Sequence, residues 1–317
     1  MKKIFPNLLH SLFLIVLLNS LGLAQTPPNT DKTEQPTVFD VHWHYPGQAA
    51  FSANIQAMKA LNVKYAVLIG TNSQISETKT ENSRWFLPAL TFPCENGKMA
   101  NIGIQCFEDG AVFPNLPKLR ERIQNGNIKM LAELNAQYLG IAPNDSRLEP
   151  YFALAEELDI PIGLHLGIGP PGVSYNSSRF PPVKSPNSRG FAGNPLLLED
   201  VLVKHPQLRI YAMHAAYPFL NEMIYMLYMH PQLYVDVSVL QWAIPRAAYY
   251  SYLRSLVEAG FAKRIMFGSD GNTTRLKEGI EAIMEADFLT VEQKKDILYN
   301  NAVRFFRVNE NFEKKEK

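Results

Sequence analysis

The chain has 317 residues, of which 46% are hydrophobic and 19% are charged. These are ordinary values for a packed globular protein, so a mostly disordered chain is excluded. The formal net charge is +1, from 31 basic and 30 acidic residues, which gives no electrostatic case for binding nucleic acid or an anionic membrane surface. Two cysteines, neither of them in a CxxC pattern, exclude a small disulfide-built scaffold.

The first 24 residues are expected to form a cleavable secretory signal peptide. Lys2 and Lys3 give a basic start, residues 8–23 are mostly apolar, and small residues up to Ala24 suit a signal peptidase. A permanent membrane anchor is the alternative, but the apolar run is short and polar residues interrupt it. We therefore expect a periplasmic or secreted protein with no membrane span after cleavage.

The remaining chain is expected to divide into three parts. Residues 25–36 are polar and rich in proline, which is typical of a flexible linker. The folded region is expected over 37–308, followed by a charged tail over 309–317. In an oxidising compartment Cys94 and Cys106 could form a disulfide, and two separate thiols are the alternative.

Apolar, β-branched segments alternate with segments of helical spacing along the folded region. Strands are expected over 37–44, 63–69, 84–92, 127–134, 160–166, 208–214, 233–239 and 264–269. Helices are expected over 52–61, 116–124, 148–158, 195–203, 219–229, 246–259, 276–286 and 291–299. This alternation predicts an α/β fold with parallel strands, and eight units favour a closed (β/α)8 TIM barrel. An open doubly wound sheet is the alternative, although no GxGxxG follows the first strand.

Four of the seven histidines lie at or near the C-terminal ends of predicted strands one, five and six. They are His42, His44, His165 and His214. In a barrel, these strand ends form the face that carries the active site. His205 and His230, by contrast, end predicted helices just before proline, where an imidazole suits the negative end of the helix dipole. We expect those two histidines to be structural.

The pair His42 and His44 suggests a metal site. Side chains at i and i+2 of a strand point the same way, so both imidazoles could bind one cation at about 2.0–2.1 Å. Asp40 is expected on the same face, either accepting from a ligand N–H or capping local backbone. Asp270 follows the eighth predicted strand. The sequence therefore predicts histidines and a carboxylate converging at the barrel mouth; scattered core histidines are the alternative.

Five motifs occur in a characteristic order along the chain. They are DVHWH at 40–44, GLHLG at 163–167, MHAAYP at 213–218, FGSD at 267–270 and ILYNNA at 297–302. In this combination the sequence resembles the amidohydrolase superfamily, specifically its amidohydrolase-related (type 2) branch. The resemblance covers nearly all of the chain after the signal peptide. It implies a barrel hydrolase with one or two divalent metals, usually zinc, in which the four histidines are ligands or near-ligands and Asp270 contacts the metal and the attacking water.

The end of the fourth predicted strand carries a further candidate ligand. Some members of the superfamily bridge two metals there with a carbamylated lysine, and others with a glutamate. Glu133 lies at this end, whereas Lys129 lies four residues earlier on the same face, too deep for the role. Glu133 is therefore the candidate bridging ligand. A substrate-binding or loop-anchoring glutamate beside a single metal is the alternative.

A mechanism follows from this set of groups. A bound zinc ion would lower the pKa of water and polarise a substrate carbonyl, and manganese or iron would also suit these ligands. Asp270 would accept the proton of the water and pass it to the leaving group.

The long segment over 168–194, after the fifth strand, is expected to select a small-molecule substrate. Arg179, Lys184 and Arg189 could meet a substrate carboxylate, and Tyr175 could stack beside it. A solvated loop that contacts nothing is the alternative.

Three functions remain in competition. The leading one is an exported hydrolase of an amide, lactone or ester bond. The second is a non-oxidative decarboxylase, because the same branch contains such lyases with nearly the same ligand set. The third is a catalytically silent binding protein on the same barrel. The sequence leaves open whether the protein forms a homo-oligomer.

Overall fold

The computed structural model describes residues 35–78, 85–95, 97–98, 104–107, 109–175 and 185–308. The expected signal peptide, nearly all of the expected linker and the C-terminal tail lie outside the described residues. Among the described helices, none has both the length and the apolar character needed to cross a bilayer.

Eight parallel strands form one sheet in which each strand lies beside the next one along the chain. They are β1 (Val38–His44), β2 (Val63–Gly70), β3 (Phe86–Phe92), β4 (Met130–Leu134), β5 (Ile162–His165), β6 (Ile210–Met213), β7 (Leu233–Asp236) and β8 (Ile265–Met266). The last strand returns to the first, because the Val41 amide donates to the Phe267 carbonyl at 3.0 Å. The predicted (β/α)8 barrel is thereby confirmed and the open sheet is excluded.

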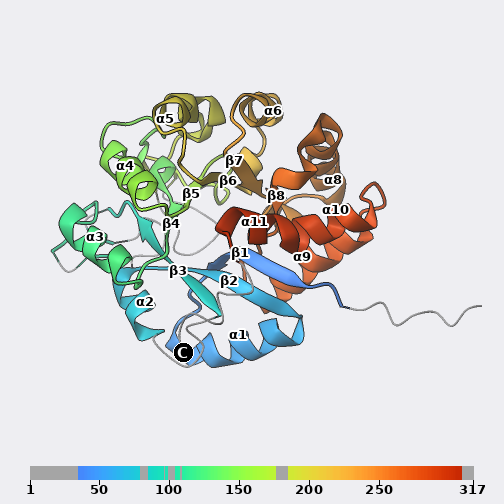
Figure 1. Cartoon of the computed structure of the whole chain (residues 1–317), viewed down its shortest axis with the longest axis horizontal. Coiled ribbons are helices and arrows are strands. Elements are labelled where there is room, and N and C mark those ends of the chain that lie inside the picture. The colour runs from blue at the N-terminus through green and yellow to red at the C-terminus, as the bar shows by residue number, and fades with distance from the viewer. Residues whose placement is uncertain are drawn as a thin grey trace, which may run out of the picture. The chain divides into compact units, whose positions relative to one another are not determined.

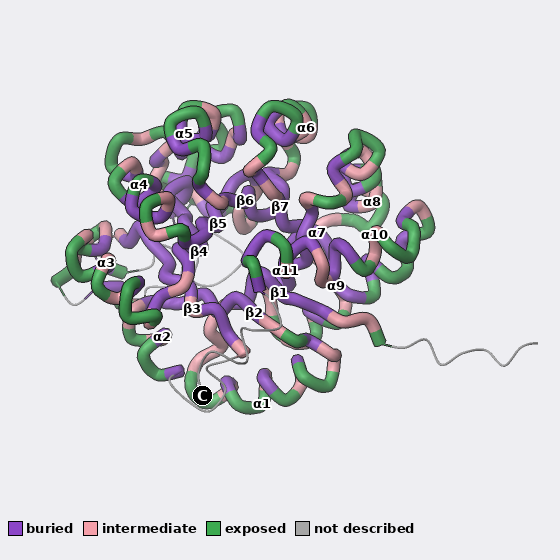
Figure 2. Tube along the Cα trace, in the orientation of Figure 1, coloured by how far each residue is buried: buried purple, intermediate pink, exposed green. Residues whose placement is uncertain are grey.

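Helices surround the strands (Figure 1). They are α1 (Gln48–Ala60), α2 (Asn72–Glu77), α3 (Leu116–Gln124), α4 (Glu149–Glu157), α5 (Glu199–Lys204), α6 (Leu220–Met229), α7 (Leu240–Ala243), α8 (Arg246–Leu256), α9 (Thr273–Glu285), α10 (Val291–Lys295) and α11 (Asn301–Phe306). Figure 2 shows that the strands are buried while the outward faces of these helices are exposed. Helix α3 has the predicted bounds, because Asn115 caps its first turn and Pro117 lies where no backbone donor is needed.

Apolar side chains fill the barrel in two layers. The inner layer contains Phe39 and Val41 of β1 together with residues of α11. The ring of Phe39 stacks on that of Phe306 with centroids 5.2 Å apart. The outer layer lies between strands and helices, where Trp43 stacks on Phe51 of α1 at 6.0 Å. Helix α11 therefore packs at the end of β1 where the strand begins, and the carboxyl ends of the strands are left for a site.

The state of the two cysteines was open in the sequence. Cys94 and Cys106 form a disulfide, which confirms their pairing rather than two separate thiols. The bond joins two parts of the long connection between β3 and α3.

Candidate metal centre

Strand β1 directs His42 and His44 toward the barrel mouth. Its pairing with β2 is irregular between Asp40 and Trp43, so the alternation of side chains is not continuous along the strand. Before this irregularity Phe39 lies in the inner layer; after it Trp43, four residues further along, lies in the outer layer. The imidazoles on either side of Trp43 approach each other, with 3.2 Å between their Nε2 atoms.

Asp40 has the second of its two predicted roles. Its Oδ1 accepts from the backbone amides of His42 at 3.1 Å and Ser269 at 2.9 Å. It therefore caps backbone rather than orienting a ligand imidazole, since the irregular register takes it off the face of the histidines. Burial raises the pKa of Asp40 to about 6. Its contacts join β1 to the segment after β8, which fixes the two ends that carry His42 and Asp270.

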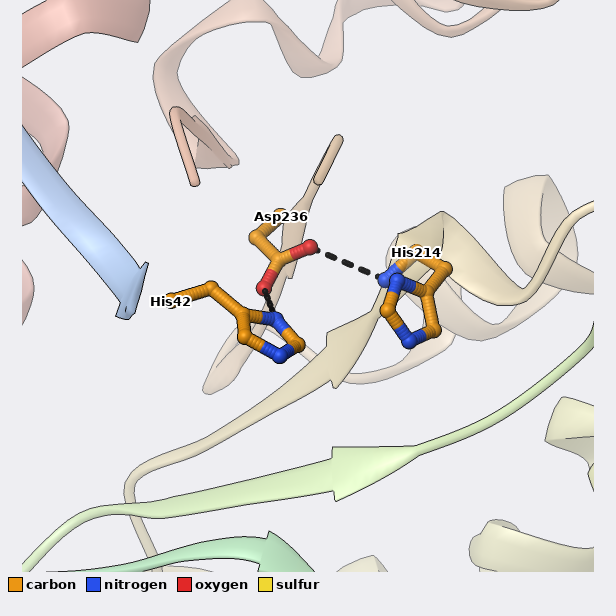
Figure 3. A group of neighbouring side chains, drawn as sticks. All are labelled: His42, His214 and Asp236. Carbon is orange, nitrogen blue, oxygen red and sulfur yellow. Dashed lines mark hydrogen bonds and ion pairs between the residues drawn. The ribbon is translucent and has the colours of Figure 1, made fainter. Parts of the chain in front are cut away.

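Asp236, at the end of β7, takes the orienting role, and sequence reasoning missed it. Its Oδ2 lies 3.1 Å from Nδ1 of His42, and its Oδ1 accepts from the backbone amide of His214 at 2.9 Å (Figure 3). The Ser238 hydroxyl donates to the same Oδ1 at 2.6 Å and lies within 3.0 Å of Nδ1 of both histidines. The sequence feature that could have indicated this role is an acidic residue near the end of the predicted strand 233–239.

His214 enters the site from a left-handed turn. The φ angles of His214, Ala215 and Ala216 are 57°, 46° and 52°. This conformation cannot continue a strand, so β6 ends at Met213, one residue earlier than predicted. A β-carbon on Gly167 would lie 2.6 Å from the carbonyl carbon of Ala216, so only glycine allows this close approach. The Tyr252 hydroxyl donates to the Ala215 carbonyl at 2.7 Å and holds the turn from the side of α8.

Glu133, at the end of β4, lies between two groups of histidines. Its Oε1 contacts Nδ1 of His165 and lies 3.4 Å from Nε2 of His214. Its Oε2 lies 3.4 Å from Nε2 of His44. The two oxygens of one carboxylate thus reach both groups, which is the placement that a bridging ligand requires. Lys129 precedes the first residue of β4.

Asp270 lies at the solvent side of the cluster. Its Oδ1 is 3.6 Å from Nε2 of His42 and 3.4 Å from Nε2 of His44. Its Oδ2 is 4.0 Å from Nδ1 of His214. The side chain of Asp270 is 21% exposed and that of His44 is 35% exposed, whereas His42 is fully buried. Asp270 and His44 are therefore the groups of this cluster that an incoming molecule meets.

The carboxylates of the cluster are held in their ionised form. Burial alone would raise the pKa of Glu133, but His165 and the other imidazoles outweigh it and hold that pKa well below its usual range. Burial likewise opposes charge on Asp270, yet His42, His44 and His214 lower its pKa. A group that accepts a proton must begin without one, and both carboxylates meet this condition.

The pKa values of three histidines in the cluster shift in opposite directions. Burial disfavours the charged form of His44, but hydrogen bonds to Asp270 and Glu133 prevail and raise its pKa to about 10. The pKa of His214 rises to about 9, because Glu133 and the nearby aspartates outweigh its burial. Burial lowers the pKa of His165, although the nearby Glu133 opposes this shift. Without a cation, the site thus binds protons on His44 and His214.

These residues fit a divalent cation. Three groups of donor atoms lie within 4.8 Å of one another: His42–His44–Glu133, Glu133–His165–His214 and His42–His214–Asp236. Imidazole nitrogens and carboxylate oxygens are the donors that zinc prefers. Two pairs of ring nitrogens face each other, 3.2 Å apart in His42–His44 and 3.1 Å apart in His165–His214. A proton between such a pair makes one hydrogen bond, whereas a cation could be bound by both nitrogens. Nε2 of His165 is also buried without a hydrogen-bond partner among the described residues.

Of the predicted substrate-binding residues, Tyr175 and Arg189 lie within the described part of the chain. Tyr175 is 71% exposed on the segment after β5. Arg189 donates from Nη1 to the carbonyls of Pro186 and Ser188, both at 2.8 Å, so its guanidinium is held within its own loop. Arg179 and Lys184 lie outside the described residues. Contacts of these side chains with a substrate stay predictions.

The sequence matches a known family over more than half of its length. Residues 114–308 match the sequence model of a family described as amidohydrolase. Protein fluG of Emericella nidulans is 23% identical over an alignment of 168 residues, and the match covers 47% of this chain. The match spans only 18% of that fungal protein.

Several solved structures have the same fold. An uncharacterised TIM-barrel protein of Bordetella bronchiseptica is 16% identical, with a TM-score of 0.63 over 86% of this chain and 98% of that one. A probable 2-pyrone-4,6-dicarboxylic acid hydrolase of Acinetobacter baumannii is 14% identical, with a TM-score of 0.56 over 86% and 100% of the two chains. A 5-carboxyvanillate decarboxylase of Sphingomonas paucimobilis is 14% identical, with a TM-score of 0.57 over 86% and 99%. Identities this low establish a shared fold alone.

Proposed function

This chain belongs to the amidohydrolase family of metal-dependent enzymes, and from that premise we propose that it hydrolyses an amide, ester or lactone bond of a small molecule. The observation that carries the proposal is the position of Asp270. Its ionised carboxylate lies 3.4 Å from His44 and 3.6 Å from His42, at the side of the cluster that solvent reaches.

The proposed metal is zinc, as one or two ions. The residues that would hold it are His42, His44, Glu133, His165, His214 and Asp270. When bound, a divalent cation lowers the pKa of water and polarises a carbonyl group. Manganese and iron also accept imidazole and carboxylate ligands, so elemental analysis decides among the three.

The proton-transfer step belongs to Asp270. Because its pKa is lowered, the carboxylate is free to accept a proton from the attacking water. The same proton then passes to the nitrogen or oxygen that leaves, so Asp270 ends the reaction as it began. Asp236 supports this step indirectly, because its contact with Nδ1 of His42 keeps Nε2 of that ring directed at the cluster.

The segment after β5 is the proposed source of substrate selection. Its basic side chains Arg179 and Arg189, with Tyr175, would favour a substrate that carries a carboxylate. The basic and apolar pattern of the first 24 residues further supports an exported enzyme. Determining the N-terminal residue of the mature protein, and the cell fraction that contains it, tests that part of the proposal.

Turnover in water labelled with oxygen-18 tests the reaction class. The purified protein, loaded with zinc, is offered a panel of amides, esters, lactones and aromatic carboxylic acids. Hydrolysis places one labelled oxygen in the product acid. Decarboxylation releases carbon dioxide without incorporating the label into the organic product, and it would replace hydrolysis as the function; the Sphingomonas decarboxylase has the same fold. Metal-replete protein that turns over no member of the panel would instead favour a binding protein.

A further inference from the structure

Tyr138 differs from most buried tyrosines of this barrel. It lies in the short 3-10 helix η1 (Ala136–Leu139), directly after β4, and is only 4% exposed. Other buried tyrosines donate to a backbone carbonyl: Tyr151 to Pro114 at 2.7 Å and Tyr211 to Val41 at 2.8 Å. The Tyr138 hydroxyl has no hydrogen bond to any described residue. Tyrosine hydroxyls in a protein interior usually find a partner, and the Tyr138 hydroxyl is not among the fully enclosed unpartnered atoms, so this donor is available for a molecule that is not part of the chain.

The surroundings of Tyr138 place this donor beside the metal centre. Its ring lies against the imidazole of His165, with centroids 4.7 Å apart. The hydroxyl end lies against Gly169, where a β-carbon would come within 3.2 Å of the phenol oxygen. Gly169 is the second residue of the segment proposed to bind substrate. Tyr138 therefore contacts both a histidine of the cluster and the first residues of the segment proposed to bind substrate.

From this placement we propose that the Tyr138 hydroxyl is a catalytic hydrogen-bond donor to the substrate oxygen on which negative charge develops. The inference rests on the proposed hydrolysis and adds a residue to it. Attack of water on a carbonyl carbon moves an electron pair onto the carbonyl oxygen. A hydrogen-bond donor that is fixed in a site from which water is excluded stabilises that charge. The phenol keeps its proton throughout, so Tyr138 donates a hydrogen bond and Asp270 alone transfers the proton.

The Tyr138→Phe substitution removes this donor and little else. We expect kcat/KM to fall about 100-fold, the usual loss when one donor to a developing oxyanion is removed, with unchanged metal content and Tm. Tyr249→Phe is the matched control, because the Tyr249 hydroxyl is also buried without a hydrogen-bond partner but lies on α8 in the outer layer. The control should keep wild-type kcat/KM.

A substrate with sulfur in place of the carbonyl oxygen makes the test specific. Sulfur is a weak hydrogen-bond acceptor. The ratio of wild-type kcat/KM to that of Tyr138→Phe should therefore fall toward one for the thiono substrate. An equal loss on the oxygen and sulfur substrates, or no loss on either, would overturn the assignment. Gly169→Ala gives a second variant, because the added methyl group would displace the Tyr138 ring without removing its hydroxyl. It should reproduce the loss.

Equilibrium binding separates this inference from the proposed function. Phenyl methylphosphonate presents anionic oxygens in a tetrahedral arrangement and needs no turnover. We expect Tyr138→Phe to bind it about tenfold to a hundredfold more weakly than wild type and the Tyr249→Phe control. Equal affinities would refute the role of Tyr138 even if hydrolysis were established, whereas weakened binding without turnover on any substrate would refute hydrolysis alone.

Discussion

Histidines pair with carboxylates in two regions of this barrel, and the two regions differ in how the pairing is made. In the outer layer, Nδ1 of His205 lies 2.8 Å from Glu156 and Nε2 lies 3.1 Å from Glu149. Each ring nitrogen thus has its own carboxylate. Both glutamates are partly exposed, and together they join the end of α5 to α4. This group leaves no nitrogen for another ligand.

At the barrel mouth, ring nitrogens face one another and share carboxylates. His42 faces His44 at 3.2 Å, and His165 faces His214 at 3.1 Å. Glu133 serves both pairs. His205 is 5% exposed and therefore also buried, so neither burial nor a nearby carboxylate identifies a ligand. Convergence of ring nitrogens from several histidines on a shared carboxylate identifies it, and each of the following experiments tests that distinction.

Removing a convergent imidazole should have the largest effect. His42→Ala should lower metal affinity by more than about 100-fold, since residues that only orient a ligand are already worth about 10–100-fold. Turnover should disappear with the metal. Elemental analysis and activity of the purified protein measure both effects. Stoichiometric metal in His42→Ala would contradict the ligand assignment.

Removing the proton acceptor should separate catalysis from metal binding. Asp270→Ala should lower kcat by about 10²–10⁴-fold, the usual contribution of a positioned general base, with metal largely retained. Steady-state kinetics beside elemental analysis check this. If the metal left together with the activity, Asp270 would be chiefly a ligand.

A substitution of Asp236 tests whether a residue that contacts the candidate ligands affects metal affinity. Asp236→Asn keeps the shape of the side chain but weakens the contact that fixes His42, so metal affinity should fall about 10–100-fold. Competition with a chromogenic chelator measures the affinity. An unchanged affinity would show that Ser238 is sufficient to orient the ring.

The raised pKa values of His44 and His214 make metal binding depend on pH. Both groups carry protons at pH 7, with pKa values of about 10 and about 9, and must release them to bind a cation. Affinity should therefore rise from pH 6 to pH 8 by about tenfold per pH unit for each proton released. Calorimetry in buffers of different ionisation enthalpy counts the protons. Binding without proton release would contradict these protonation states.

His205→Ala should have the smallest effect on the metal centre. Its loss leaves Glu149 and Glu156 without their shared partner, which should lower the free energy of unfolding by about 1–3 kcal/mol. Thermal unfolding measures the change, while metal content should stay that of wild type. Loss of metal from this variant would erase the distinction between the two regions.

The sequence predicted the barrel because its evidence is periodic. Alternating strand and helix segments locate all eight strands, and histidines at strand ends locate the mouth. Strand ends were less accurate: predicted strand 264–269 pairs only at Ile265 and Met266. The following residues bind β1 through single contacts such as that of Asp270 with the His42 carbonyl. These contacts depend on the closed barrel, which local residue patterns do not encode.

Within the site, the sequence identified residue types better than their partners. It placed Glu133 at a strand end, where the family resemblance made it a candidate bridging ligand; that its two oxygens reach two groups of histidines is a finding of the structure. It misplaced Asp40, because the irregular register of β1 cannot be read from alternation. It missed Asp236 and Ser238. Their role depends on contact with His42, which is 194 and 196 residues away in the sequence, and no local pattern indicates that contact.

The left-handed turn at His214 sets a limit on engineering this protein for heat resistance. In the left-handed conformation a residue with a β-carbon raises the free energy of the folded state by roughly 1–2 kcal/mol. Three successive residues with a β-carbon adopt this conformation here. Glycine at Ala215 or Ala216 would relieve that cost, so a search for thermostable variants would select it. The same exchange would loosen the backbone that aims an imidazole into the cluster. At this turn, a gain in thermal stability is therefore expected to reduce catalytic activity.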